Sequence, residues 1–232
     1  MEKTSFFGII GGMGTIATEK FVQALNAGIN ARRDQDYYNF ILINHASVPD
    51  RTAYILDSFN ENPLPALIED VKKMDAFGVQ FIVLLCNTAH YFIDELQKYS
   101  KCAILNMPKE AVLKLKQEYP TACKVGVIAA EGSIKTKIYE KELLENGLVP
   151  FIPGAALQER ISKLIYEDLK RDDFLNIPLF NSIVKGLFQS GCDLVLIGCT
   201  EISAIYSCGE ADTVNVVDAQ TILLQKIHCM LQ

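Results

Sequence analysis

The sequence predicts an α/β protein with two similar domains, each a three-layer unit whose mostly parallel sheet is covered by helices on both faces. Short apolar runs of strand length alternate with longer segments of helical periodicity along the whole chain, which is typical of parallel sheets with crossover helices. Two strand and turn patterns of the first half recur in the second. The 232 residues, 50% of them hydrophobic, suffice for a substantial core.

The first half begins with an apolar run at 5–10, the glycine turn Gly11–Gly14 and a helix over 15–29. Further strands are expected at 40–43, 81–85 and 103–105, and further helices at 62–77, at 88–98 and after Pro108. Pro63 in the first turn and Gly78 just beyond the end mark the bounds of the helix over 62–77. Pro49–Asp50 predicts a loop that ends the second strand.

The second half continues in the same way to the end of the chain. Strands are expected at 124–130, 148–152, before Cys199 and at 214–217, and helices at 155–169, 176–190 and 219–231, with another helix ending within 142–147. We therefore expect one domain over 1–105 and a second over 106–213. The last strand and helix, 214–232, could pack back on the first domain, which composition leaves open.

The internal repeat relates the chemistry of the two halves. GIIGGMGT at 8–15 aligns with GVIAAEGS at 126–133, and FGVQFIVLLCNT at 77–88 aligns with SGCDLVLIGCTE at 190–201. In both halves a cysteine, Cys86 or Cys199, lies eight residues after a glycine and ends an apolar strand. The repeat predicts a duplicated unit with pseudo-two-fold symmetry and a site in the cleft between the domains.

Composition excludes several classes of partner and environment. The balance of 22 basic and 28 acidic residues gives a net charge of −6, and no basic cluster exceeds Arg32–Arg33, so we expect no nucleic-acid partner. Seven scattered cysteines do not form the pattern of a disulfide framework and indicate a reducing compartment. No apolar run approaches the roughly 20 residues of a membrane span, and FFGIIGGMG fits a first strand and turn better than a signal segment. We expect a soluble cytoplasmic protein without a membrane partner.

Cys86 and Cys199 are the candidate catalytic residues. Each stands where a strand runs into a helix, at the sheet edge where open α/β sheets bind ligands. A helix amino-terminus lowers the pKa of a nearby thiol, so Cys86 could be partly thiolate near neutral pH, whereas most free cysteines are simply small buried apolar residues. Two thiols that approach one ligand from opposite sides could invert a carbon, because one removes a proton and the other supplies one to the opposite face.

Other residue types meet the further needs of such a reaction. Backbone N–H groups of the glycine turn at Gly12 and Met13, with the hydroxyls of Thr88, Ser133 and Thr200, could stabilise a carbanion next to a carboxylate. Arg51 and Lys170 could hold a substrate with two carboxylates, although Arg51 could equally be an exposed loop residue. The turn resembles GxGxxG only loosely, with Ala17 in place of the last glycine, so a dinucleotide is not favoured over a small ligand.

No metal site is expected. Cys86 and His90 have i, i+4 spacing, but no second close Cys/His pair completes a zinc site. His90 is interpreted as a cap or packing residue, because a lone histidine seldom defines a site.

The motifs GIIGGMG, VPDR, CNTAH, IYEDLK and GCTE, in this order between residues 8 and 201, resemble the aspartate/glutamate racemase family and in particular its aspartate racemase branch. The resemblance covers essentially the whole chain. It implies a cofactor-independent two-base racemase with two α/β domains, often a homodimer. It also implies that Cys86 and Cys199 form the acid/base pair. By the same likeness Asn87, Thr88 and Thr200 hold the α-amino and α-carboxylate groups, and Arg51 with Lys170 binds the side-chain carboxylate.

Two positions refine this expectation. Thr15 follows the glycine turn where the family usually has proline, which bears on the shape of the turn. Glu201 stands where glutamate racemases tend to carry histidine, which favours aspartate or a broader amino-acid range. The alternatives are a hydantoin racemase or maleate isomerase type of enzyme and a non-catalytic amino-acid-binding protein. Two cations argue against the neutral hydantoin ring, and two intact cysteines argue against binding alone.

Overall fold

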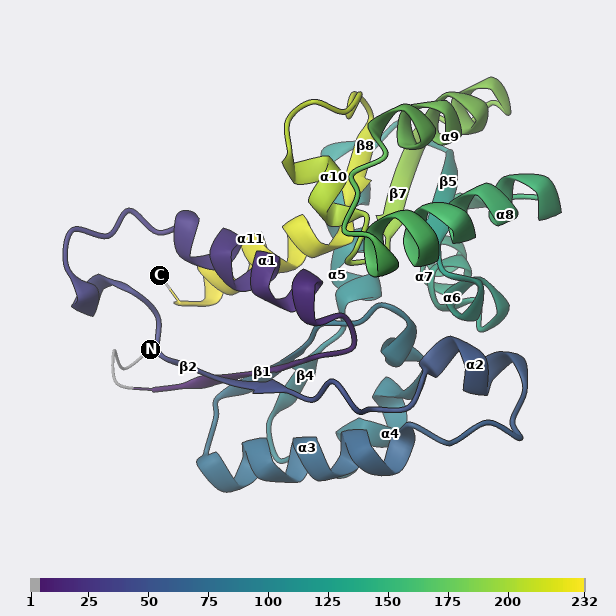
Figure 1. Cartoon of the computed structure of the whole chain (residues 1–232). Helices are drawn as coiled ribbons and strands as arrows, with labels where there is room; N and C mark the ends of the chain where they lie inside the picture. The colour runs from purple at the N-terminus through teal and green to yellow at the C-terminus, as the bar shows by residue number, and fades with distance from the viewer. Residues whose placement is uncertain (1–4, 232) are drawn as a thin grey trace. The chain divides into compact units, whose positions relative to one another are not determined.

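The computed structural model of the chain describes residues 5–231 and divides into two compact units (Figure 1). Unit 1 comprises the chain up to Asn106 together with the segment from Leu223 onward, and unit 2 comprises Met107–Ile222. Each unit is built on its own parallel sheet of four strands. The predicted fold class, two α/β domains with parallel sheets, is confirmed.

The sheet of unit 1 has the strand order β2-β1-β3-β4. Its strands are β1 (Phe7–Gly11), β2 (Phe40–Asn44), β3 (Phe81–Leu84) and β4 (Ala103–Leu105). The chain adds β2 on one side of β1 and then returns to add β3 on the other side. The loops that follow β1 and β3 therefore diverge, and open α/β sheets generally bind ligands beside such a reversal of strand order.

Helices cover both faces of this sheet (Figure 1). On one face, α3 (Leu64–Phe77) and α4 (Ile93–Gln97) bury an apolar cluster that includes Ile10, Ile82 and Met74. On the other face lie α1 (Thr15–Ala27) and α11 (Ala219–Leu231). The Tyr38 hydroxyl and His228 Nδ1 are 3.0 Å apart and attach α11 to the segment before β2.

The sheet of unit 2 repeats this arrangement with the order β6-β5-β7-β8. Its strands are β5 (Lys124–Ala129), β6 (Val149–Phe151), β7 (Leu194–Gly198) and β8 (Val216–Asp218). One face is covered by α8 (Ala155–Ser162), the π-helix η3 (Lys163–Arg171) and α9 (Ile177–Gln189), which share an apolar core with β5 and β7. The helices α5 (Met107–Glu118), α6 (Glu131–Lys135) and α7 (Ile138–Glu145) complete the unit.

Some elements differ from the predicted ones. The helix expected over 88–98 is a 3₁₀-helix, η2 (Thr88–Phe92), followed by α4, and the helix expected over 155–169 changes into the π-helix η3. The short elements η1 (Asp34–Asp36), α2 (Arg51–Leu56) and α10 (Ser203–Ser207) were not predicted. The helix α2 begins at Arg51 because the Asp50 side chain caps it, accepting the Ala53 N–H at 2.7 Å.

The C-terminal segment is shared between the units. Val216–Asp218 pairs with β7, so this last strand belongs to the sheet of unit 2 and does not return to the first half. Only the part of α11 from Leu223 onward is grouped with unit 1.

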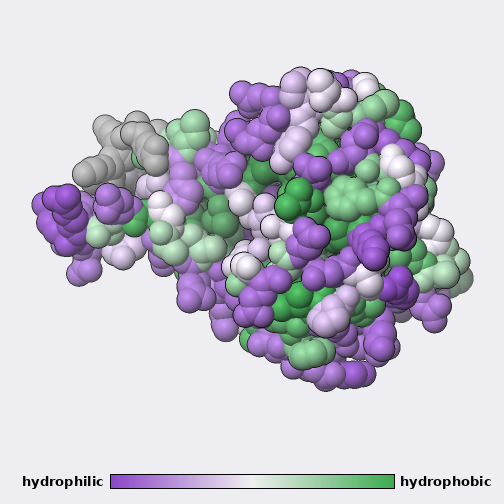
Figure 2. Space-filling view, turned by 90° about the horizontal axis from the view of Figure 1, so that it is seen from above, coloured by the Kyte–Doolittle hydropathy of each residue, from purple (hydrophilic) through white to green (hydrophobic). Residues whose placement is uncertain are grey.

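The helices and the surface bear on membrane contact and on hydrophobic patches. Among residues 5–231, no helix is both long and apolar enough to cross a membrane. The face drawn in Figure 2 carries hydrophilic side chains interspersed with smaller hydrophobic areas.

Candidate active site

Each unit places a cysteine at the carboxyl edge of its sheet, the edge at which open α/β sheets generally bind ligands. In unit 1, Cys86 follows β3 after one residue, and the glycine turn follows β1. In unit 2, Cys199 follows β7 directly, and the loop to α6 follows β5. Both cysteines are buried free thiols. Equivalent positions in the two sheets therefore carry the same reactive group.

Cys86 begins a turn that His90 holds in place. The Cys86 carbonyl accepts a hydrogen bond from His90 Nδ1 at 2.9 Å, and His90 Nε2 lies 3.4 Å from the Leu105 carbonyl. Burial lowers the pKa of His90, so its ring is neutral and fixes the backbone at Cys86. Asn87 and Thr88 are buried in the same turn, at the start of η2. His90 thus has the packing role that the sequence favoured.

The glycine turn is shaped by close backbone contacts. Gly12 has a φ of +86°, and a Cβ there would lie 2.4 Å from the backbone nitrogen of His45, so only glycine fits. Its N–H donates to Thr18 Oγ1 at 3.0 Å, and the Thr18 hydroxyl donates to the Gly14 carbonyl at 2.9 Å. The Gly12 N–H that the sequence suggested as a substrate donor is therefore used within the turn.

Arg51 connects this turn to the loop after β2. Its Nη1 donates to the carbonyls of Val48 and Pro49 at 3.1 and 3.0 Å, and its Nη2 donates to the carbonyl of the buried Met13 at 2.9 Å. The side chain is only 6% exposed, so the alternative of an exposed loop arginine is wrong. The buried Nε has no hydrogen-bond partner among the described residues, so its N–H remains for another acceptor.

Unit 2 gathers a cluster around the carboxylate of Glu201. Cys199 Sγ and Thr200 Oγ1 both donate to Glu201 Oε2, at 3.1 and 3.2 Å. Lys170 Nζ forms an ion pair with Glu201 Oε1 at 3.2 Å and lies 5.4 Å from the centre of the Tyr166 ring. Tyr166 and Lys170 both lie on the π-helix η3, an element found often at functional sites.

The electrostatics of this cluster keep Cys199 protonated. Burial raises its pKa well above the usual value, the charge of Glu201 raises it further, and the charge of Lys170 opposes both effects. At neutral pH Cys199 is therefore a thiol that donates its proton to the Glu201 carboxylate. Any reaction that uses Cys199 as a base must first remove this proton.

The structure distributes the predicted site residues over both units. Unit 1 holds Gly12, Met13, Arg51, Cys86, Asn87 and Thr88, and unit 2 holds Ser133, Lys170, Cys199 and Thr200. Ser133 is buried in α6, directly after the edge of β5. Most of these residues lie on segments that follow the strands of their own sheet. Lys170 lies on the π-helix η3, and its ammonium group contacts Glu201.

Sequence reasoning missed two groups of residues. It used Glu201 only as a hint to the substrate, and it did not select Tyr166, whose i, i+4 spacing to Lys170 was the available signal. It also missed His45, which follows β2 and contacts the fully buried Asp70 through Nδ1 and Oδ2 at 2.6 Å. An aspartate on the apolar stripe of the helix over 64–77 signals such a buried partner.

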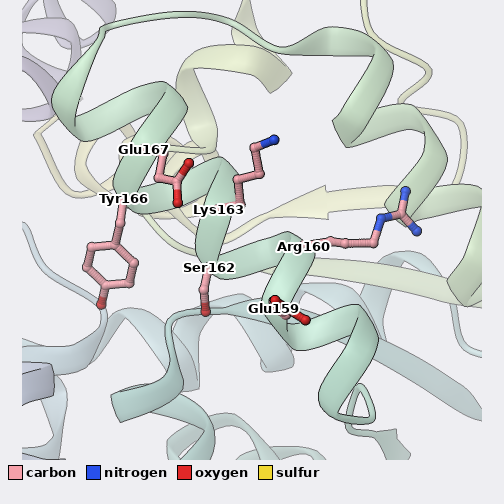
Figure 3. A pocket seen from close by; sticks show the side chains of 6 residues that line it. All are labelled: Glu159, Arg160, Ser162, Lys163, Tyr166 and Glu167. Carbon is pink, nitrogen blue, oxygen red and sulfur yellow. The ribbon is translucent and has the colours of Figure 1, made fainter.

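A hollow of about 390 Å³ lies along α8 and η3, lined by Glu159, Arg160, Ser162, Lys163, Tyr166 and Glu167 (Figure 3). The side chains of Arg160 and Lys163 point away from those of Ser162 and Tyr166. The lining therefore offers no set of polar groups that converges on one ligand atom.

Within residues 5–231, no group of three or more His, Cys, Asp or Glu side chains could hold a metal ion.

Comparison with known proteins agrees with this geometry. The Asp/Glu/Hydantoin racemase family matches the chain over residues 10–227. The broad specificity amino-acid racemase RacX of Bacillus subtilis is 25% identical over 222 residues, covering 93% of each chain. The structure is similar to the aspartate racemase of Picrophilus torridus, with a TM-score of 0.84, 26% identity and coverage of 98% and 94% of the two chains. A glutamate racemase from Bacillus anthracis shares the fold at a TM-score of 0.65 and 16% identity, over 100% and 83% of the two chains.

Proposed function

The chain belongs to the Asp/Glu/hydantoin racemase family and is an amino-acid racemase, and we propose that it interconverts L- and D-aspartate by a two-base mechanism without pyridoxal phosphate. The observation that carries the proposal is the matched pair of buried cysteines. Cys86 and Cys199 follow the third strand of two sheets with the same strand order. A reaction that inverts a carbon needs two such groups, one for each face of the substrate.

In this mechanism the two cysteines exchange roles with the direction of reaction. A thiolate on one cysteine removes the α-proton, and the thiol of the other delivers a proton to the opposite face of the carbanion. The carbanion lies next to the α-carboxylate, and its charge is stabilised by the Asn87 amide and the hydroxyls of Thr88, Ser133 and Thr200. The proposal requires that both thiols reach one substrate carbon.

The preference for aspartate rests on two cations. Arg51 has a buried N–H without a partner among the described residues, and Lys170 carries its charge beside Cys199 and Thr200. Both would attract a second carboxylate. The relative from Picrophilus torridus is named an aspartate racemase, which supports the same substrate, whereas the broad specificity of the Bacillus subtilis relative supports a wider amino-acid range. We also propose that the protein forms a homodimer, which sedimentation analysis would test.

The experiment that tests this function uses purified protein without added cofactor. The protein is incubated separately with L- and D-aspartate, and the enantiomers are separated by chiral chromatography. We expect both to converge on the racemic mixture, with a slower reaction for alanine. Turnover of a 5-substituted hydantoin or of maleate alone would move the protein to another branch of the family. Binding of aspartate without any turnover would support an amino-acid-binding protein instead.

A further inference from the structure

Glu201 is placed to exchange a proton with Cys199. Its Oε2 accepts the Cys199 thiol proton at 3.1 Å and the Thr200 hydroxyl at 3.2 Å, while its Oε1 faces Lys170 Nζ at 3.2 Å. The Glu201 side chain is 11% exposed, so the contact is shielded from most solvent. Both oxygens of this carboxylate are thus directed by neighbouring groups, and one of them points at a thiol.

The two-base mechanism creates a need for such a group. Cys199 must be a thiolate when it removes the α-proton, yet burial and the adjacent carboxylate favour its thiol form. A thiol in a buried site transfers its proton most readily to a base that is already hydrogen-bonded to it. Among the described residues, the Glu201 carboxylate accepts the hydrogen bond of the Cys199 thiol.

We propose that Glu201 is the proton-relay residue of Cys199: its carboxylate takes the thiol proton before Cys199 acts as a base. This inference rests on the proposed racemase function. The proton moves from Cys199 Sγ to Glu201 Oε2, leaving a thiolate and a neutral carboxylic acid. The thiolate then takes the α-proton and becomes a thiol again, and Cys86 gives its proton to the other face and becomes a thiolate. Solvent removes the proton from Glu201 and returns one to Cys86 before the next turnover in this direction.

Lys170 is the charged neighbour that both partners share. It forms an ion pair with the Glu201 carboxylate before the transfer, and its charge lowers the pKa of Cys199 and so stabilises the thiolate after it. Tyr139 on α7 packs against Gly198, next to Cys199, and Asp218 on β8 lies near Tyr139. Burial raises the pKa of Tyr139 well above its usual value, so the phenol keeps its proton and is not a base near neutral pH. Both carboxylate oxygens of Asp218 already accept hydrogen bonds, from the Ser203 and Thr221 hydroxyls at 2.7 Å each. When Glu201 takes up the proton it no longer neutralises Lys170, which strengthens the attraction of Lys170 for a substrate carboxylate.

The test compares Glu201→Gln with the parental protein and with the control Glu167→Gln, which removes one carboxylate from η3. Glutamine keeps the size of the side chain and an oxygen for the thiol, but it cannot take a proton. We expect kcat/KM to fall by at least about 100-fold, the lower range for general base catalysis. The loss should be equal for both enantiomers, because their equilibrium constant is 1. Glu167→Gln should retain the parental rate.

The direction of the change separates a relay from a simple electrostatic role. Removing the Glu201 charge lowers the pKa of Cys199, so alkylation of Cys199 by iodoacetamide, followed by peptide mass spectrometry, should be faster in Glu201→Gln. A residue that only raised this pKa would therefore give a faster racemase when it is removed, whereas a relay gives a slower one. Glu201→Gln that racemises at or above the parental rate between pH about 6 and 9 would overturn the proposal.

A second variant guards against loss of folding. Glu201→Asp keeps the charge but withdraws the carboxylate by one methylene, so a relay predicts a loss of at least about tenfold and a steeper dependence on pH. An unchanged rate in this variant would also overturn the relay. Because the parental protein is assayed beside the variants, failure of the racemase function shows as an inactive parental protein, and failure of the relay alone shows as an active variant.

Discussion

The glycine turn offers a prediction whose size can be worked out from the structure. Replacing Gly12 by alanine imposes two costs. The φ of +86° costs a residue with a Cβ about 1–2 kcal/mol. The new Cβ would also lie 2.4 and 2.5 Å from the backbone N and C of His45, and relieving such overpacking costs about 1–3 kcal/mol. The free energy of unfolding should therefore fall by about 2–5 kcal/mol.

Gly78 provides the matched control. Its φ of +73° is similar, but a Cβ there would meet nothing within 4 Å. Gly78→Ala should therefore lose only the backbone term of about 1–2 kcal/mol. Urea unfolding followed by circular dichroism gives both values, and racemase assays should show kcat/KM lowered by Gly12→Ala and unchanged by Gly78→Ala. Equal losses of stability for the two variants would refute the close contact between Gly12 and the His45 backbone.

Three further predictions concern the cysteines, Arg51 and His90. Cys86→Ser and Cys199→Ser should each abolish inversion of aspartate, because the serine hydroxyl is too weak an acid to exchange protons with the α-carbon. Either variant racemising at the parental rate would remove that cysteine from the mechanism. Arg51→Ala should weaken the binding of aspartate far more than the binding of alanine. By losing three hydrogen bonds, it should also lower the free energy of unfolding in urea by about 2–4 kcal/mol. Equal loss for both ligands would mean that Arg51 does not bind the substrate side chain, and Arg171→Ala at the surface is the control. The pKa of His90 is lowered in the folded state, so its contribution to stability is complete above about pH 6.5 and is lost as the pH falls below this value. His90→Gln should therefore make the free energy of unfolding less dependent on pH between about 7.5 and 5.5. An unchanged slope of the unfolding free energy against pH would contradict the buried neutral ring.

The parts of the fold that depend on periodicity could be predicted from the sequence. The strands within residues 5–231 and the long helices follow from apolar runs and helical spacing, and Gly78 marked the end of α3 correctly. Sequence periodicity does not distinguish a π-helix from an α-helix, so the change at Lys163 was not visible. The start of α2 depends on a single cap at Asp50, which reads equally well as a turn.

The candidate site could be predicted as residue types but not as partners. The repeat identified both cysteines, because it depends only on their positions in the chain. It could not show that the guanidinium of Arg51 donates to the Met13 carbonyl, since that carbonyl comes from a turn distant in sequence. It also could not show that Lys170 and Cys199 share the carboxylate of Glu201, because a helix and a strand edge must first be packed together.

The isotope content of the first product tests the two-base mechanism most directly. The parental protein is incubated in D₂O with L-aspartate, and in a parallel reaction with D-aspartate, and both enantiomers are separated early in the reaction for mass spectrometry. Two cysteines acting from opposite faces predict that the product carries one deuterium at the α-carbon while the remaining substrate keeps its hydrogen. Product that retains the original hydrogen, or substrate that exchanges as fast as product forms, would show that one group serves both faces and would contradict the pairing of Cys86 with Cys199.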